Sequence, residues 1–209
     1  MQLRALDLFC CAGGAARGLQ QAGYHVTGVD IRPQPRYAGD VFIQADAMEV
    51  DWMGYDLIWA SPPCQRYSCM RPELADSHPD LIGPVRDRLL ALGTPYIIEN
   101  VEGAPLRNPL MLCGTMFGLL VIRHRLFETN PPIYFPPATC THQRPVVTRG
   151  KRPDRDRHYA CVVGHSSDLE FTRLAMGINW MSTREISQAI PPAYARWLAE
   201  QIRMEEMSL

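Results

Sequence analysis

The chain has 209 residues, of which 46% are hydrophobic and 21% are charged, with a formal net charge of −1. These values are typical of one globular domain with a sizeable core, and no apolar run reaches the roughly 18 residues that a membrane-spanning helix needs. The first ten residues do not follow the plan of a secretory signal, because Asp7 interrupts their short apolar stretch, so we expect a cytoplasmic protein.

Short apolar strands alternate with helix-like segments through the first hundred residues. In chain order we expect a strand at 3–9, a helix at 15–22, strands at 26–30, 41–45 and 56–60, a helix at 79–92 and a strand at 96–100. This alternation predicts an α/β fold with a doubly wound, mostly parallel sheet. Ligands of such sheets bind at the carboxyl ends of the strands. The polar and reactive residues follow those ends, at 10–14, Asp30, Asp46, 61–65 and 99–100.

The composition changes after residue 128. Prolines and then arginines cluster there and regular periodicity fades, so we expect residues 1–128 to form the main domain and 129–170 a small irregular insertion. Residues 171–209 are expected to return to the main domain, with helical spacing at 171–178 and 194–202 around the breaker Pro191-Pro192.

A basic stretch lies inside the insertion. Between Arg144 and His158 there are six cations and two acids, a local excess that can bind a phosphate backbone even though the net charge is near zero. A solvated loop is the alternative. The six cations are Arg144, Arg149, Lys151, Arg152, Arg155 and Arg157.

The turn Cys10-Cys11-Ala12-Gly13-Gly14 follows the first strand and opens a helix. Its glycines can let a ligand approach the backbone and the helix start offers free N–H groups, although a plain tight turn is the alternative. The G-x-G-x-x-G pattern of nicotinamide dehydrogenases is missing. Asp30 could accept hydrogen bonds from a ribose and Asp46 could meet an adenine amino group, whereas either could instead be a helix cap. Together these features favour an adenosine-containing cofactor.

The segment Ser61-Pro62-Pro63-Cys64-Gln65 is the sharpest feature of the sequence. A cysteine just past a strand end, held by a stiff proline pair, is presented to the ligand crevice with little conformational freedom. A nearby helix start or cation would lower its pKa and make it a nucleophilic thiolate. Glu99 closes another predicted strand. If the two strands are neighbours, Glu99 shares the crevice with Cys64 and can protonate a ring nitrogen; an ordinary carboxylate paired with an arginine is the alternative.

The remaining cysteines and the histidines of the insertion carry no clear motif. Seven cysteines, an odd number, are more typical of cytosolic thiols than of a disulfide framework. We interpret Cys10, Cys69, Cys113 and Cys161 as small buried side chains. The insertion also holds residues of the types that bind zinc, namely Cys140, His142, His158, Cys161 and His165. Their spacing matches no compact zinc module, so we predict no metal site and expect core or polar surface roles.

Several of these motifs resemble those of the DNA cytosine-5 methyltransferases, in the order of that family. They are Asp-Leu-Phe at 7–9 with Ala12-Gly13-Gly14, Pro63-Cys64-Gln65, Glu99-Asn100-Val101 and Arg123-His124-Arg125. The stretches at 173–177 and 188–192 resemble the last two motifs of the family. The compact form looks most like its phage-encoded branch. The resemblance implies a class I S-adenosylmethionine-dependent, Rossmann-like fold, with 1–128 as the catalytic and cofactor-binding domain and 129–170 as a reduced target-recognition insertion.

The resemblance also implies a reaction and the residues that perform it. Cys64 would add to carbon 6 of a cytosine flipped out of duplex DNA, Glu99 would hydrogen-bond ring nitrogen 3, and Arg125 with Arg123 would hold the base's carbonyl oxygen. Carbon 5 would then take the methyl group of S-adenosyl-L-methionine. The cofactor site implied by the resemblance comprises Phe9, Ala12, Gly13, Gly14, Asp30, Ile31, Asp46, Pro63 and Gln188. The expected partner is double-stranded DNA, and the expected protein is a monomer in the bacterial or phage-infected host cytoplasm.

Three positions depart from the family pattern, and two other functions stay open. Ser187 and Gln188 replace the usual Gly-Asn of the last motif, Cys11 replaces a glycine of the cofactor turn, and the insertion is far shorter than usual target-recognition domains. The substrate could instead be transfer RNA, or the chain could be a non-catalytic DNA-binding relative. The intact motifs around Cys64 and Glu99 argue against the second alternative.

Overall fold

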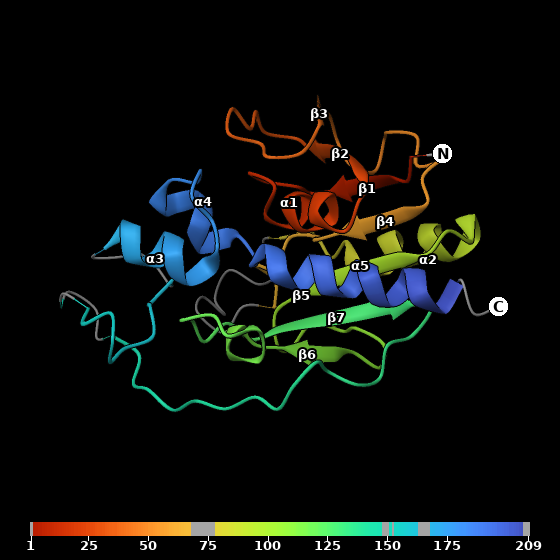
Figure 1. The fold of residues 1–209 in the computed structure, drawn as a ribbon. Coiled ribbons are helices and arrows are strands. Elements are labelled where there is room, and N and C mark those ends of the chain that lie inside the picture. The colour runs from red at the N-terminus through yellow and green to blue at the C-terminus, as the bar shows by residue number, and fades with distance from the viewer. Residues whose placement is uncertain (1, 68–77, 148–150, 152, 163–167, 207–209) are drawn as a thin grey trace.

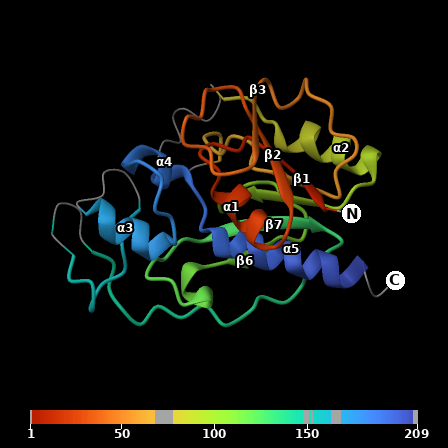
Figure 2. The same cartoon turned by 45° about the horizontal axis from the view of Figure 1, so that its top comes forward.

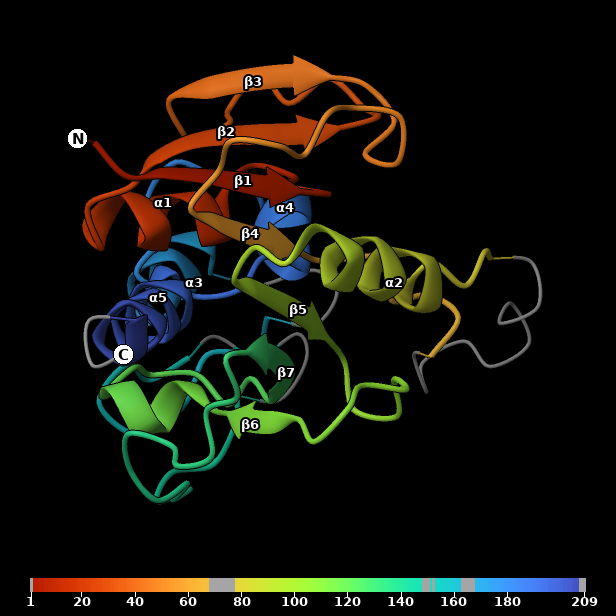
Figure 3. The same ribbon diagram turned by 90° about the vertical axis from the view of Figure 1, so that its right-hand side faces the viewer.

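The computed structural model describes residues 2–67, 78–147, 151, 153–162 and 168–206. Its described strands form one seven-stranded sheet in the order β3-β2-β1-β4-β5-β7-β6 (Figure 3). The strands are β1 (Arg4–Leu8), β2 (His25–Asp30), β3 (Val41–Gln44), β4 (Leu57–Ala60), β5 (Tyr96–Asn100), β6 (Leu110–Leu112) and β7 (Arg125–Asn130). The helices are α1 (Gly14–Gln21), α2 (Ile82–Leu92), the 3-10 helix η2 (Gly114–Phe117), α3 (Leu169–Met176), α4 (Thr183–Gln188) and α5 (Pro192–Glu206).

Helices cover both faces of the sheet. Helices α1 and α5 lie on one face and α2 on the other (Figure 3). The first face packs through a buried cluster that includes Leu19, Trp59, Phe127 and Tyr194, and the second through one that includes Trp52 and Leu89. Strands β4 and β5 read as continuous apolar runs because both of their faces are buried. The predicted doubly wound, mostly parallel sheet is therefore confirmed.

The strand pairing tests a specific expectation about the reactive residues. Strands β1, β2, β3, β4 and β5 pair in parallel, and β4 lies directly beside β5. The ends of these two strands, which precede Cys64 and contain Glu99, are therefore neighbours, which is the condition under which the sequence analysis places both residues in one crevice. The observed bounds agree with the predicted elements to within three residues at each strand and helix end of the first hundred residues.

The second half of the chain contains elements that the apolar periodicity of the sequence does not reveal. Strand β7 pairs antiparallel with β5 and with β6, and helix α4 precedes α5. Pro192 does not break the last helix but is its first residue, a position where the missing proline N–H costs nothing. Strand β7 runs to Asn130, so the predicted domain boundary at 128 falls within a strand, and the division itself stays a prediction.

The segment after β7 runs along the β6 edge of the sheet toward α3 (Figures 1 and 2). Between residues 131 and 147 the structure assigns no helix or longer strand, as expected for an irregular insertion. Of its six cations, Arg155 lies 3.1 Å from Asp168 and 3.0 Å from Glu170, and Arg157 lies 3.6 Å from Asp154. Arg149 and Arg152 lie outside the described residues. Phosphate binding by this stretch stays a prediction.

Among the helices of the described chain, none combines the length and the apolar character needed to cross a membrane.

Candidate active site

Cys64 follows β4 in a segment that two neighbouring strands hold in place. The Ser61 N–H donates to the Leu8 carbonyl of β1 at 3.1 Å, and the buried Asn100 amide of β5 donates to the Pro62 carbonyl at 2.9 Å. The Cys64 carbonyl accepts a turn hydrogen bond from the Tyr67 N–H at 3.0 Å. The thiol is half-buried. The proline-containing segment is thus fixed to the sheet before the cysteine and closed by a turn after it.

Glu99 and Arg125 face one another across the antiparallel pair β5–β7. Glu99 is opposite Phe127 in the register, and its Oε1 lies 3.1 Å from Nε of Arg125. The two side chains are 11% and 19% exposed, so the ion pair is largely shielded from water. Arg125 also donates to the His124 carbonyl at 2.7 Å. The ion pair with an arginine, which was the alternative role of Glu99, is therefore present. It leaves Glu99 beside Cys64, where the catalytic role would also require it.

Arg123 is buried behind this pair. Its Nη2 donates to the Ser187 carbonyl at 3.0 Å, and its own carbonyl accepts from the Tyr194 hydroxyl at 2.7 Å. Within the described chain its Nε has no hydrogen-bond partner. Burial, together with the nearby positive charge of Arg125, lowers the pKa of Arg123 to about 9. Helices α4 and α5 therefore fix the arginine motif through backbone and hydroxyl contacts that the sequence motifs do not indicate.

The electrostatic surroundings of Cys64 differ from the sequence expectation. Burial raises the pKa of the Cys64 thiol, and the negative charge of Glu99 raises it further. Arg125 and Arg123 act in the opposite direction but do not outweigh these two effects. The expected lowering of the pKa is therefore wrong for the protein alone, because burial opposes the thiolate. Burial and Glu99 thus favour the neutral thiol, and Arg125 and Arg123 favour the thiolate.

The turn after β1 has a strained backbone and is tied to Asp30. Phe9 and Cys11 have positive φ angles of 60° and 46°, and Gly13, the N-cap of α1, has 79°. Asp30 accepts from the Cys11 N–H at 3.0 Å and from the Arg32 N–H at 2.9 Å. Two oxygens that each receive one N–H keep lone pairs for further donors. Asp30 can therefore hold the turn and still accept from ribose hydroxyls.

The two glycines of the turn lie against other parts of the protein that leave no space for a side chain. A Cβ on Gly13 would lie 2.9 Å from the Ala38 nitrogen and 3.0 Å from the Tyr37 ring, and one on Gly14 would lie 2.7 Å from the Ile190 carbonyl oxygen. Their small size is thus required by the loop after β2 and by the chain before α5, in addition to the backbone conformation. The Trp180 indole N–H donates to the Ala12 carbonyl at 2.8 Å. No sequence signal pointed to this contact.

The other predicted cofactor residues occupy different surroundings. Ile31 is 66% exposed, and Phe9 is partly buried against the core face that contains Trp52. Gln188 is the exposed last residue of α4, two residues before the Ile190 carbonyl that abuts Gly14. Asp46 accepts from the Met48 N–H at 2.8 Å in a turn, and no helix begins there, so the helix cap left open as its alternative is not seen. Pro63 is half-buried beside Cys64.

The fold and the placement of these residues can be compared with known proteins. The chain matches no protein-family model and no curated protein. A solved structure from E. coli, described as a "putative DNA modification methyltransferase encoded within prophage", matches with a TM-score of 0.61 and 14% identity, over 96% of this chain and 98% of that one. Structures of Dnmt2 from Spodoptera frugiperda and S. pombe match at TM-scores of 0.46 and 0.45, with 18% and 19% identity, over 61% of this chain and about half of theirs. The chain therefore has the Rossmann-like fold of the class I S-adenosylmethionine-dependent methyltransferases, as the sequence predicts.

Proposed function

We propose that the protein is a DNA cytosine-5 methyltransferase in which Cys64 is the nucleophile and Glu99 the acid that assists it. The observation that carries the proposal is the arrangement of Cys64, Glu99 and Arg125 at the ends of β4, β5 and β7. The thiol is held by backbone contacts beside an ion pair that is largely shielded from water. The fold and the full-length match to the prophage protein support the same assignment.

The chemistry needs a nucleophile because carbon 5 of cytosine does not take a methyl group unaided. Bond formation between the Cys64 sulfur and carbon 6 raises the electron density at carbon 5. Glu99 stabilises the adduct by a hydrogen bond to nitrogen 3, and Arg125 holds the carbonyl oxygen of the base. After carbon 5 is methylated, loss of its proton expels Cys64 and restores the thiolate.

The raised pKa of Cys64 suggests how the thiol is activated. A proton moved from the thiol to the Glu99 carboxylate leaves a thiolate and a neutral acid, which are the two forms that the addition needs. The same transfer removes the negative charge that raises the pKa of Cys64. The thiolate would then lie beside Arg125 with no opposing charge. Activation of the thiol would thus involve both side chains of the pair.

S-adenosylmethionine would supply the methyl group at the carboxyl ends of β1 and β2. Asp30 would accept from its ribose hydroxyls, and Phe9 with Ile31 would contact its adenine. The free lone pairs of Asp30 and the exposure of Ile31 support this fit. The start of α1 has no side-chain cap, and it follows the carboxyl end of β1, so its first N–H groups would lie at the same end of the sheet as the cofactor.

Mechanism-based trapping tests the proposal. Duplex DNA with 5-fluorocytosine at its target positions should form a covalent adduct that survives a denaturing gel, only when S-adenosylmethionine is present, because fluorine at carbon 5 blocks the final elimination. Cys64→Ser should abolish the adduct and the methylation. The matched control is Cys161→Ser, which changes a half-buried cysteine of the insertion and should leave both intact.

Two outcomes would overturn the assignment. Normal methylation by Cys64→Ser would show that the nucleophile is wrong. An adduct with transfer RNA and none with duplex DNA would keep the chemistry and replace the substrate. Sequencing of the DNA to which the protein becomes covalently attached, in a host that expresses it, also identifies the target positions.

A further inference from the structure

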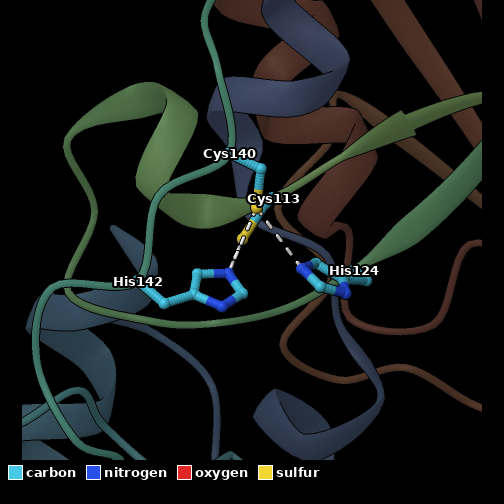
Figure 4. A group of neighbouring side chains, drawn as sticks. All are labelled: Cys113, His124, Cys140 and His142. Carbon is cyan, nitrogen blue, oxygen red and sulfur yellow. Dashed lines mark hydrogen bonds between the residues drawn. The ribbon is translucent and has the colours of Figure 1, made fainter.

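We propose that the protein binds a structural zinc ion through Cys113, His124, Cys140 and His142. These residues come from three separate parts of the chain, yet one candidate ligand atom of each lies within 4.8 Å of every other (Figure 4). Cys113 directly follows β6, His124 directly precedes β7, and Cys140 with His142 belongs to the insertion. The proposal replaces the sequence expectation of no metal site.

The distances between the ligand atoms match a tetrahedral ion. Zn–S bonds of about 2.3 Å and Zn–N bonds of about 2.0–2.1 Å place sulfur and nitrogen about 3.6 Å apart at a tetrahedral angle. The Cys113 sulfur lies 3.6 Å from Nε2 of His142, and the Cys140 sulfur lies 3.5 Å from Nε2 of His124 and 3.1 Å from Nε2 of His142. Two sulfurs and two imidazole nitrogens in this arrangement favour Zn²⁺ among the common metals.

The surroundings complete the site in the manner expected of zinc. Metal-bound histidines usually donate their other ring N–H to a carboxylate, which fixes the ring and its tautomer. Nδ1 of His124 lies 3.4 Å from Oε1 of Glu102, while its Nε2 faces the cluster. The Thr115 hydroxyl lies 3.4 Å from the Cys113 sulfur and 4.0 Å from that of Cys140, so it can donate to a thiolate. The rings of His124 and His142 are stacked with centroids 5.3 Å apart.

Four protein ligands leave no open position, so the ion would be structural and not catalytic. It would fasten residues 140–142 of the insertion to the ends of β6 and β7. His124 lies between Arg123 and Arg125, so the same ion would anchor the segment that carries both arginines. The described part of the insertion has little regular structure of its own, and a metal cross-link would supply the constraint that hydrogen-bonded strands do not.

Metal analysis of the purified full-length protein tests the site. Protein produced in zinc-supplemented medium and dialysed should hold about one zinc per chain, and metal-free protein titrated with Co²⁺ should develop the intense absorption of tetrahedral thiolate coordination. His142→Ala should lose the zinc and this spectrum. Its side chain is exposed, so the variant should keep its circular dichroism. The matched control is His158→Ala, which removes another histidine of the insertion and should retain the metal.

Glu102→Ala provides a finer test. This exposed carboxylate contacts His124 and not the ion, so its loss should weaken zinc affinity by about 10- to 100-fold without abolishing binding. Three results would overturn the proposal: zinc-supplied protein without metal, equal metal loss in His158→Ala, or a Cys113–Cys140 disulfide in protein purified without reductant. None of these measurements depends on methylation, so they are independent of the proposed function.

Discussion

The buried ion pair between Arg86 of α2 and Glu128 of β7 offers the clearest quantitative test of the structure. Glu128 accepts from Nε and Nη2 of Arg86 at 2.7 and 2.6 Å, from the Arg107 N–H at 2.7 Å and from the Tyr96 hydroxyl at 3.2 Å. Arg86 and Glu128 are 6% and 3% exposed. This network joins α2 to both strands that hold Glu99 and Arg125.

Removal of either partner leaves a buried charge without compensation. We expect Arg86→Met and Glu128→Gln each to lower the free energy of unfolding by about 3–5 kcal/mol. In a chain of this size 1 kcal/mol corresponds to roughly 2–4 °C, so each variant should unfold about 6–20 °C below the wild type. The double variant should lose less than the sum of the two single losses, because the second change removes the charge that the first left unpaired.

Thermal and urea unfolding measure these losses, and a surface ion pair is the matched control. Arg196 and Glu200 lie 2.8 Å apart with side chains 55% and 34% exposed, so Arg196→Met should cost less than about 1 kcal/mol. Burial opposes ionisation of Glu128, but its hydrogen bonds outweigh burial and lower its pKa. The stabilisation by Glu128 is therefore complete above the unfolded-state pKa of about 4.3 and lost as the pH falls through the folded-state pKa. A double variant that loses the full sum of the two single-variant losses in unfolding free energy would refute the reasoning.

Three further predictions concern the proposed site and the buried Asp7 of β1. Glu99→Gln removes a negative charge that raises the pKa of Cys64, so iodoacetamide should alkylate Cys64 faster at neutral pH. The same variant should methylate DNA about 100- to 10,000-fold more slowly because the acid is lost. If alkylation and methylation both slowed, the proposed effect of Glu99 on Cys64 would be contradicted. Asp30→Ala should weaken S-adenosylmethionine binding by roughly 10- to 100-fold in calorimetry, and unchanged affinity would remove Asp30 from the cofactor site. Burial raises the pKa of Asp7 well above its ordinary value, so the wild type should lose stability relative to Asp7→Asn as the pH rises above the unfolded-state pKa of about 3.9, whereas a constant difference in unfolding temperature would count against this shift.

The parallel strands themselves could be predicted because periodicity and turn residues act locally. The strands that precede Cys64 and contain Glu99 are short, apolar and bounded by loop residues, so their type follows from simple rules, whereas their adjacency was only a condition that the structure fulfils. Strand β6 has three residues, too few for a periodic pattern, and the polar residues of β7 conceal its partly buried character. Its antiparallel pairing with β5 depends on contacts between distant parts of the chain.

The details of the site depended even more on tertiary contacts. The sequence placed Cys64 at a strand end but could not show that burial and Glu99 together raise its pKa. It suggested cofactor contacts for Gly13 and Gly14, whereas the structure shows that nearby protein atoms also require their small size. The sequence analysis did not connect Cys113 and His124 with Cys140 and His142. The spacing of ligands along a sequence indicates a metal site only when the ligands lie within one compact module. The folded chain brings all four together.

The arginine motif explains how the proposed active site and the proposed zinc site can share one short segment. In extended backbone, successive side chains point to opposite sides. Arg123 contacts Ser187 and Arg125 pairs with Glu99, whereas His124 between them approaches Glu102 and Cys140. Arg125 can therefore meet the base, with Arg123 packed behind it, while the histidine holds the ion. Since the ion would restrain the backbone at residue 124, it would limit the motion of both arginines without contacting either one.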